Sequence, residues 1–188
     1  DVRIVGNGWV GWNGDLDGED DANEGTLHFS HWTVAWNGCA ETWPGEEPAG
    51  CWAQEAGGYG DGVGTGFTRG HWIIEDSAFL YNTSDGLDLL YALPGAQIEV
   101  RRTRAEGNAG NQIKTAGPAY LENNIVVGNC GYFDGQPFAY WVDHCRAAGN
   151  ALSLTVRRGD PVGIVNNTIS GEGDCLVLGE CADGSCNG

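Results

Sequence analysis

Two segments of the chain, "EDSAFLYNTSDGLDLLY" (residues 75–91) and "RRTRAEGNAGNQIKTAG" (residues 101–117), align without a gap. Each contains an asparagine, Asn82 or Asn108, with an apolar residue three positions before it and another five positions after it. Short apolar alternation on both sides of a polar turn position is typical of two β-strands joined by a tight bend. The alignment therefore indicates an internal repeat, which decides the fold class.

The same pattern extends along most of the chain when one polar residue is taken as the anchor of each repeat. The anchors are Asn13, Asn37, Asn82, Asn108, Asn129, Asn150 and Glu172. Three positions before them lie the apolar residues Val10, Val34, Phe79, Ala105, Val126, Ala147 and Ile169. Eight positions before them lie Val5, Phe29, Ile74, Val100, Leu121, Val142 and Ile164. A repeat of this length, built only of short strands and Gly/Asn turns, predicts an all-β solenoid, a parallel β-helix of about seven coils.

The repeats predict one domain over residues 1–188. Leucine-rich repeats lack support because their leucine spacing is absent, and no long amphipathic helix favours ankyrin-like or tetratricopeptide arrays. A cysteine-flanked insertion is expected at about residues 38–57, and a cysteine-rich cap at about residues 174–188. The N-terminal end shows no cap, so self-association through open ends is expected. We read the chain as a mature protein or an excised domain.

The composition excludes several partners. The formal net charge is −17 and the basic residues form no stripe, which argues against nucleic acid and anionic membrane surfaces. No segment is long and apolar enough to insert into a membrane. Seven cysteines favour an oxidising, secreted or cell-surface location, and their odd number leaves at least one thiol without a partner in this chain.

Lys114 is the only lysine of the chain. In the coil alignment it lies in the same outward-facing column as Asp88, one coil earlier. Asp85 aligns with Asn111, and "GYGDGVGT" aligns with "NTSDGLDL", which places Asp61 beneath Asp85. Three carboxylates this close either bind a cation, for which Ca²⁺ is the natural candidate, or form a solvated acidic face with an Asp88–Lys114 ion pair.

The motifs "SDGLDLLY" (84–91) and "GNAGNQIKTAG" (107–117) resemble those of the family-nine polysaccharide lyases, which are calcium-dependent pectate lyases with a right-handed parallel β-helix. The resemblance implies that Asp61, Asp85 and Asp88 are Ca²⁺ ligands. It also implies that Lys114 is the Brønsted base. Ser84 stands where the family has a further aspartate ligand, and it is kept as a candidate ligand.

The implied reaction is β-elimination on a uronate-containing, pectate-like polysaccharide. Removal of the C5 proton requires neutralisation of the substrate carboxylate, which a bound Ca²⁺ supplies, and a neutral amine as base. Arginine stays protonated, which explains why a lysine is needed at position 114. Since the three aspartates raise the pKa of Lys114 when no metal is bound, the hypothesis predicts strict metal dependence and an alkaline optimum.

Other functions stay open on the sequence alone. A non-catalytic, calcium-stabilised β-helix for glycan binding or surface assembly would use the same fold, and a glycoside hydrolase would use Asp85 and Asp88 as its carboxylate pair. Tryptophans for stacking on sugars are Trp9, Trp12, Trp36, Trp43 and Trp52. The favoured alternative for two of them is that Trp12 and Trp36 stack on each other. The acidic segment at residues 14–25 is read as a solvated turn, with a second Ca²⁺ as the alternative.

Overall fold

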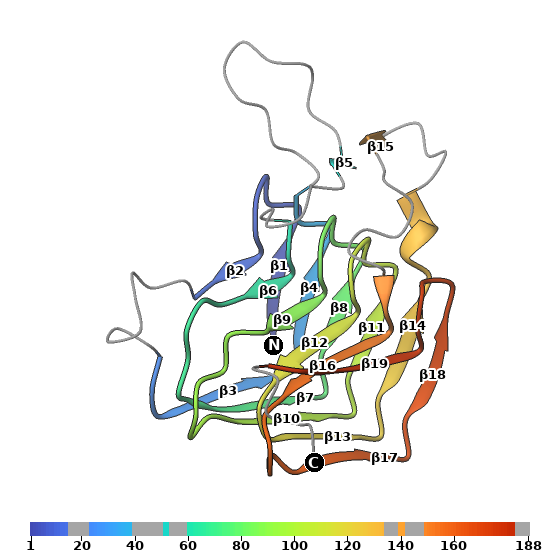
Figure 1. The fold of residues 1–188 in the computed structure, drawn as a ribbon. Helices are drawn as coiled ribbons and strands as arrows, with labels where there is room; N and C mark the ends of the chain where they lie inside the picture. Colours follow the sequence, from blue (N-terminus) through green and yellow to red (C-terminus); the bar gives the residue numbers. More distant parts are fainter. Residues whose placement is uncertain (15–22, 39–50, 53–59, 134–138, 142–148, 183–188) are drawn as a thin grey trace.

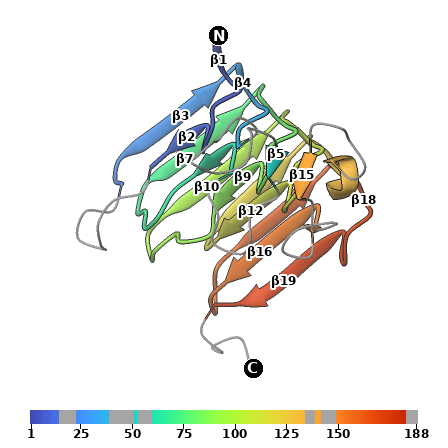
Figure 2. The ribbon, with the colours of Figure 1, turned by 90° about the horizontal axis from the view of Figure 1, so that it is seen from above.

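The computed structural model describes residues 1–14, 23–38, 51–52, 60–133, 139–141 and 149–182. Three parallel sheets, here called sheets I, II and III, are wound by successive coils of the chain (Figure 1). Seen from above, the coils stack in sequence order from the N-terminal to the C-terminal end (Figure 2). The predicted parallel β-helix is therefore confirmed.

Successive coils add one strand at a time to each sheet, and sheets I and III have six strands whereas sheet II has five. Sheet I contains β1 (Val2–Val5), β4 (Trp32–Ala35), β8 (Ala78–Leu80), β11 (Arg104–Glu106), β14 (Ile125–Gly128) and β18 (Thr168–Gly171). Sheet II contains β3 (Thr26–Ser30), β7 (His71–Glu75), β10 (Gln97–Arg101), β13 (Ala119–Glu122) and β17 (Val162–Val165). Sheet III contains β2 (Trp12–Asn13), β6 (Val63–Gly64), β9 (Leu87–Leu89), β12 (Ile113–Ala116), β16 (Leu152–Val156) and β19 (Val177–Cys181). Outside these sheets, β5 (Cys51–Trp52) pairs with β15 (Ala139–Trp141), and the 3₁₀ helix η2 spans Cys130–Phe133.

The core consists of apolar columns that run from coil to coil. The column in sheet I is Ile4, Val34, Phe79, Ala105, Val126 and Ile169. The column in sheet II is Phe29, Ile74, Val100, Leu121 and Ile164. The column in sheet III is Trp12, Val63, Leu87, Ile113, Leu152 and Val177. Since strand side chains alternate between faces, the residues of each column point towards the core while their neighbours in the strand point outward.

At two of the bends between sheets, one residue of the coil adopts a left-handed backbone conformation with a positive φ. Between sheets II and I this residue is His31, Asp76, Arg102, Asn123 or Asn166. At the next bend it is Gly6, Trp36, Tyr81 or Gly107. A positive φ is disfavoured for residues other than glycine, so the ordered stacking of the coils compensates for this local cost at every turn.

An asparagine ladder follows the second of these bends. Asn7 Nδ2 donates to Asn37 Oδ1 at 2.8 Å, and Asn37 Nδ2 donates to Asn82 Oδ1 at 2.8 Å. Asn82 Nδ2 donates to Asn108 Oδ1 at 2.7 Å, and the ladder ends where Asn108 Nδ2 donates to Gln112 Oε1 at 2.9 Å. In the central coils the ladder therefore runs through the predicted anchors Asn37, Asn82 and Asn108.

The predicted anchor of the first repeat is wrong. The ladder position belongs to Asn7, whereas Asn13 lies in β2 and pairs with Gly64 of sheet III. Both alignments place a valine or isoleucine three positions before an asparagine, so the sequence pattern could not separate them. Pairing of β1 with β4 decides the register, because it sets Ile4 beside Val34.

The predicted equivalence of Asn150 with the anchors Asn82 and Asn108 is also wrong. Its Nδ2 donates to Asn111 Oδ1 at 3.0 Å, so it belongs to a second ladder at the turn into sheet III. Asn111 Nδ2 donates in turn to Asp85 Oδ1 at 2.9 Å. The core positions predicted from the Asn150 anchor, Val142 and Ala147, lie outside the described residues.

The predicted stacking of Trp12 on Trp36 does not occur. Trp12 points into the N-terminal end of the core, with ring centroids 5.4 Å from Phe29 and 5.7 Å from Trp72. Phe29 stacks on Trp32 at 4.2 Å. These rings fill the N-terminal end of the core, where no cap was predicted. Trp36 instead contacts Tyr81, at 5.0 Å, on the outside of another turn.

The predicted cap at about residues 174–188 lies partly outside the described residues. Within residues 174–188, Val177–Cys181 forms β19, the last strand of sheet III, and residues 183–188 lie outside the described part. The core columns are exposed there: Ile164 and Val177 are 40% and 41% exposed, against 0% for the equivalent Leu121 and Leu152.

The cysteines agree with the odd count. Cys175 has a free thiol. The insertion at about residues 38–57 lies mostly outside the described residues, which include only its β5 segment. Within the described ranges, no helix has both the length and the apolar character needed to cross a membrane.

We predict that Asn82→Ala lowers the free energy of unfolding by about 3 kcal/mol. The substitution removes the acceptor for Asn37 N and Nδ2 and the donor to Asn108, all of them buried. Urea denaturation followed by circular dichroism measures the effect. Asn13→Ala, at an exposed residue outside the ladder, is the control and should lower the free energy of unfolding by less than Asn82→Ala does. Equal effects of the two substitutions would contradict the observed register.

Candidate active site

The candidate site lies on the outer face of sheet III, where β9 and β12 are neighbours. Lys114 of β12 is the direct strand partner of Asp88 of β9, as the coil alignment predicted. Gly64 of β6 lies beside Asp88, and Ser153 of β16 lies beside Lys114. Because Leu87 and its neighbours alternate into the core, the charged pair is held at a fixed position on the sheet.

Lys114 makes two ion pairs. Its Nζ lies 3.0 Å from Asp88 Oδ2 and 3.1 Å from Asp85 Oδ2. The side chains are only 19% exposed for Lys114, 15% for Asp88 and 3% for Asp85. The only lysine of the chain is therefore not an exposed surface residue but the centre of a largely buried ionic cluster.

The second oxygen of each carboxylate is held by the backbone. Asp85 Oδ1 accepts hydrogen bonds from Asn111 N at 2.6 Å and from Asn111 Nδ2 at 2.9 Å. Asp88 Oδ1 accepts from Leu90 N at 2.9 Å, and Asp61 Oδ1 accepts from Asp85 N at 2.8 Å. These contacts fix the carboxylates, because a side chain bonded to a backbone amide has lost its rotamer freedom.

Ser84 lies next to this cluster rather than beside Lys114. It is 1% exposed, and its side chain hydrogen-bonds to Asp61. The five predicted site residues therefore come from three successive coils, because Asp61 precedes β6, Lys114 lies in β12, and the other three lie in β9 or the turn before it.

Close packing of the turns needs glycine at two places. A Cβ on Gly110 would lie 2.4 Å from Asp85 Oδ1, and a Cβ on Gly64 would lie 3.0 Å from Asp61 Oδ2. Real Cβ atoms do not approach an oxygen so closely at Gly110, so this glycine is required for the aspartate to join the ladder. Gly64 and Gly110 thus leave space for the carboxylates of Asp61 and Asp85, which are the predicted site residues.

The site holds one positively charged side chain, Lys114, against the three carboxyl groups of Asp61, Asp85 and Asp88. Burial lowers the pKa of Lys114, but the nearby charges of Asp85 and Asp88 and their hydrogen bonds outweigh it, so that this pKa is raised. Burial and the charge of Asp85 raise the pKa of Asp88 to about 6, although Lys114 opposes the shift. Burial, Asp85 and Asp88 raise the pKa of Asp61 well above its usual range, against hydrogen bonds from Ser84 and the Asp85 backbone. Without a further cation, the cluster holds protons tightly.

The carboxylates suit a hard cation in ligand type and charge. Their spacing in this structure is set by the ammonium group of Lys114. As the side chains stand, no group of three or more His, Cys, Asp or Glu residues within the described ranges is arranged to hold a metal ion. A cation that used Asp85 Oδ2 and Asp88 Oδ2 would have to displace Lys114 Nζ from the same two oxygens.

Sequence reasoning missed the residues that hold the site together. Asn111 was seen only as a coil equivalent of Asp85, yet it bonds Asp85 on one side and Asn150 on the other. Ser153, 5% exposed, flanks Lys114 on the following strand and was not singled out. The signal lay in the spacing from Asn150 to Ser153, which repeats that from Asn111 to Lys114, but the wrong anchor column hid it.

Residues 14–25, read as an acidic turn, lie mostly outside the described residues. Comparison of the chain with protein-family models, with curated proteins and with solved structures gave no match.

We predict that Asp61→Asn stabilises the protein at pH 8 by at least about 1 kcal/mol. The raised pKa of Asp61 means that the folded state bears the cost of a buried charge above that pKa, whereas well below pH 4 the carboxyl is protonated in both the folded and the unfolded state. The gain should therefore shrink as the pH falls from 8 towards 4. Asparagine keeps the oxygen that accepts from Asp85 N.

The measurement is urea unfolding at several pH values in a buffer with chelator, so that no divalent cation replaces the missing charge. Asp76→Asn is a matched control, because the pKa of that exposed aspartate is lowered by its hydrogen bond to Arg102, and its removal should not stabilise. A stability difference for Asp61→Asn that is independent of pH would contradict the prediction.

Proposed function

We propose that this β-helix is a secreted, calcium-dependent polysaccharide lyase that cleaves uronate-containing, pectate-like chains by β-elimination. The observation that carries the proposal is the cluster on sheet III, in which a buried lysine faces two carboxylates on the neighbouring coil and a third lies behind them. The resemblance of "SDGLDLLY" and "GNAGNQIKTAG" to the family-nine lyases supports the same assignment.

Each residue has a defined task in this proposal. Asp61, Asp85 and Asp88 would hold Ca²⁺, with Ser84 beside them; the bound ion supplies neutralisation of the substrate carboxylate. Lys114 Nζ removes the C5 proton of the uronate. The backbone contacts of Asp85 and Asp88 keep the carboxylates in place while Lys114 changes partner.

The resting ion pairs set the condition for activity. Lys114 cannot act as a base while Asp85 and Asp88 hold it protonated, since its pKa is raised in this arrangement. If Asp85 and Asp88 held Ca²⁺, Lys114 Nζ would lose its two partners and meet a positive charge, which would lower the pKa of the amine. The proposal therefore demands metal dependence and an alkaline optimum.

The test is ultraviolet absorbance of unsaturated products from polygalacturonate, with Ca²⁺ and with chelator. We expect activity only with Ca²⁺, and a loss of at least about a hundredfold in Lys114→Arg. Arginine keeps a cation between Asp85 and Asp88 but does not deprotonate, so it separates catalysis from charge balance. Activity that survives the chelator, or a fully active Lys114→Arg variant, would overturn the proposal.

A second function is favoured by a specific observation. Asp61 and Asp85 are members of the turn ladder, and Lys114 neutralises part of the cluster without any metal. A non-catalytic β-helix for glycan binding or surface assembly would use the cluster only to stabilise its coils. Ca²⁺ would then raise thermal stability but no substrate would be cleaved.

We predict that Lys114→Met binds Ca²⁺ at least about tenfold more tightly than the wild type at pH 7. The ammonium group and the metal compete for Asp85 Oδ2 and Asp88 Oδ2, so removal of the competitor favours the metal. Isothermal titration with Ca²⁺ measures the affinity, and Arg102→Met, at an exposed ion pair away from the cluster, is the control. Weaker binding by Lys114→Met would show that the cation does not use these oxygens.

A further inference from the structure

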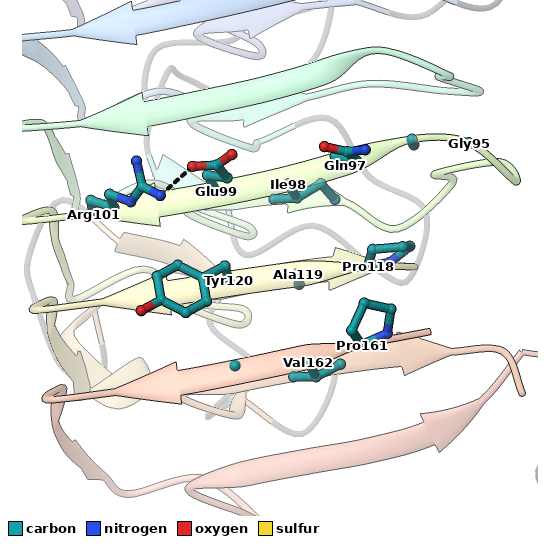
Figure 3. Close-up of a pocket in the computed structure, with 12 residues that line it drawn as sticks. Gly95, Gln97, Ile98, Glu99, Arg101, Pro118, Ala119, Tyr120, Pro161 and Val162 are labelled. Carbon is teal, nitrogen blue, oxygen red and sulfur yellow. Dashed lines mark ion pairs between the residues drawn. The ribbon is translucent and has the colours of Figure 1, made fainter. Parts of the chain in front are cut away.

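A groove of about 720 Å³ lies on the outer face of sheet II, on a different sheet from the candidate active site. It crosses β10, β13 and β17 together with the turns that precede them (Figure 3). Its volume falls in the range of small-ligand sites. Pro118, Pro161 and Gln97 lie towards one end of the groove, and Tyr120 and Arg101 lie towards the other (Figure 3).

Tyr120 forms a supported aromatic surface in this groove. Tyr120 is 36% exposed, whereas most outward-facing residues of the neighbouring strands are polar. The ring lies over Gly163 of the next coil, where a Cβ would come within 2.6 Å of a ring carbon. Glycine at this position therefore leaves room for the ring to lie down on the sheet between β13 and β17.

Polar groups border the ring. The Arg101 guanidinium carbon lies 5.6 Å from the ring centroid of Tyr120. Arg101 pairs with Glu99 at 2.5 Å and with Glu122 at 3.6 Å, and Glu99 also bonds His71 at 2.7 Å. Arg101 Nε is buried and makes no hydrogen bond in this structure. The border thus offers fixed donors and acceptors beside an apolar platform.

The charge of the groove selects the ligand. Among the described residues that line it, Arg101 is the one cation, and it is matched by two carboxylates, Glu99 and Glu122. The whole chain carries a formal charge of −17. A polyanionic chain would be repelled here, because no unmatched positive charge attracts it.

We propose that this groove, named the Tyr120 groove, is a binding site for a neutral polysaccharide. A pyranose ring has an apolar face of C–H groups that stacks on an aromatic ring, and hydroxyl groups around its edge that take hydrogen bonds. The Tyr120 ring provides the first contact, and Arg101, Glu99 and Gln97 provide the second. The coils of the β-helix are spaced by one strand separation, so a linear glycan that crosses them meets a new coil at about each sugar. This inference does not rest on the proposed lyase activity.

The test is native affinity electrophoresis of the full chain in gels that contain galactomannan, xyloglucan or mixed-linkage β-glucan as neutral probes, with polygalacturonate as the anionic probe. We expect retardation by at least one neutral polysaccharide and a dissociation constant about fivefold higher for Tyr120→Ala. Tyr120→Phe should retain most of the binding. Gly163→Val should weaken it by lifting the ring.

Tyr91→Ala is the matched control, because Tyr91 is a 51% exposed tyrosine outside the groove, and its binding should equal that of the wild type. Gln97→Ala, at an exposed rim residue, provides a second weakened variant that leaves the ring in place. The proposal is overturned if no neutral polysaccharide retards the protein, if Tyr120→Ala binds as the wild type does, or if Tyr120-dependent binding is found only for polygalacturonate. Sedimentation that shows a dimer dissociated by Tyr120→Ala would assign the face to self-association and would also overturn it.

Discussion

The structure depends on hydrogen bonds that run from the turn of one coil to the turn of the next. In the ladder at the turn into sheet III, each side-chain oxygen accepts from the backbone amide of the following coil. The acceptors are Asp61, Asp85, Asn111 and Asn150, and the last of these receives Cys175 N. A buried turn without such acceptors would leave its amides unpaired, at a cost of roughly 1–3 kcal/mol for each group. The ladders thus fix the register that the interchangeable aliphatic residues of the core would allow to slip.

The candidate site is built from this same ladder. Asp85 Oδ1 belongs to the ladder and Asp85 Oδ2 belongs to the ion pair with Lys114, so one carboxylate serves the fold and the charge cluster at once. An asparagine at position 85 would keep the acceptor of the ladder, as Asn111 does one coil later. The choice of aspartate over asparagine at positions 61 and 85 therefore needs a reason beyond the fold, and the charge of Lys114 or of a metal ion provides one.

The repetition in the sequence was sufficient to predict the fold and the central part of the site. Columns through Phe79, Ala105 and Val126 have neighbours on both sides, so a spacing error in one coil would conflict with two others. The same argument put Lys114 beside Asp88, since "SDGLDLLY" and "GNQIKTAG" belong to adjacent coils without an insertion between them. The coils at the two ends of the described β-helix have a neighbouring coil on one side only, so a spacing error there conflicts with fewer contacts. Asn13 and Asn7 both fit the first coil, and only the backbone pairing of β1 with β4 selects Asn7.

Packing between residues far apart in the sequence explains the remaining differences between the sequence-based predictions and the structure. Trp12 shares the position before an asparagine with Trp36, yet it lies in sheet III and turns inward, where its ring contacts Phe29 and Trp72. The Tyr120 groove was likewise invisible in the sequence. Tyr120 and Gly163 are 43 residues apart in numbering, and their contact appears only when β13 and β17 are paired. The alignment of the repeats predicts which residues lie on the same face of the sheet. It does not predict that a glycine on the next strand makes room for the tyrosine ring.

The balance of charge around Lys114 links proton and metal chemistry at one place. Two carboxylates contact one ammonium group and a third lies behind them, and the raised pKa values of Asp61 and Asp88 mean that the cluster takes up protons when no other cation is present. A divalent cation would compete with these protons and with Lys114 for the same oxygens, so metal binding must release protons from the cluster. The catalytic and the purely structural functions then differ at a single atom, Lys114 Nζ. A catalytic lysine leaves the carboxylates when the cation arrives and becomes a base, whereas a structural lysine stays and keeps the cation out.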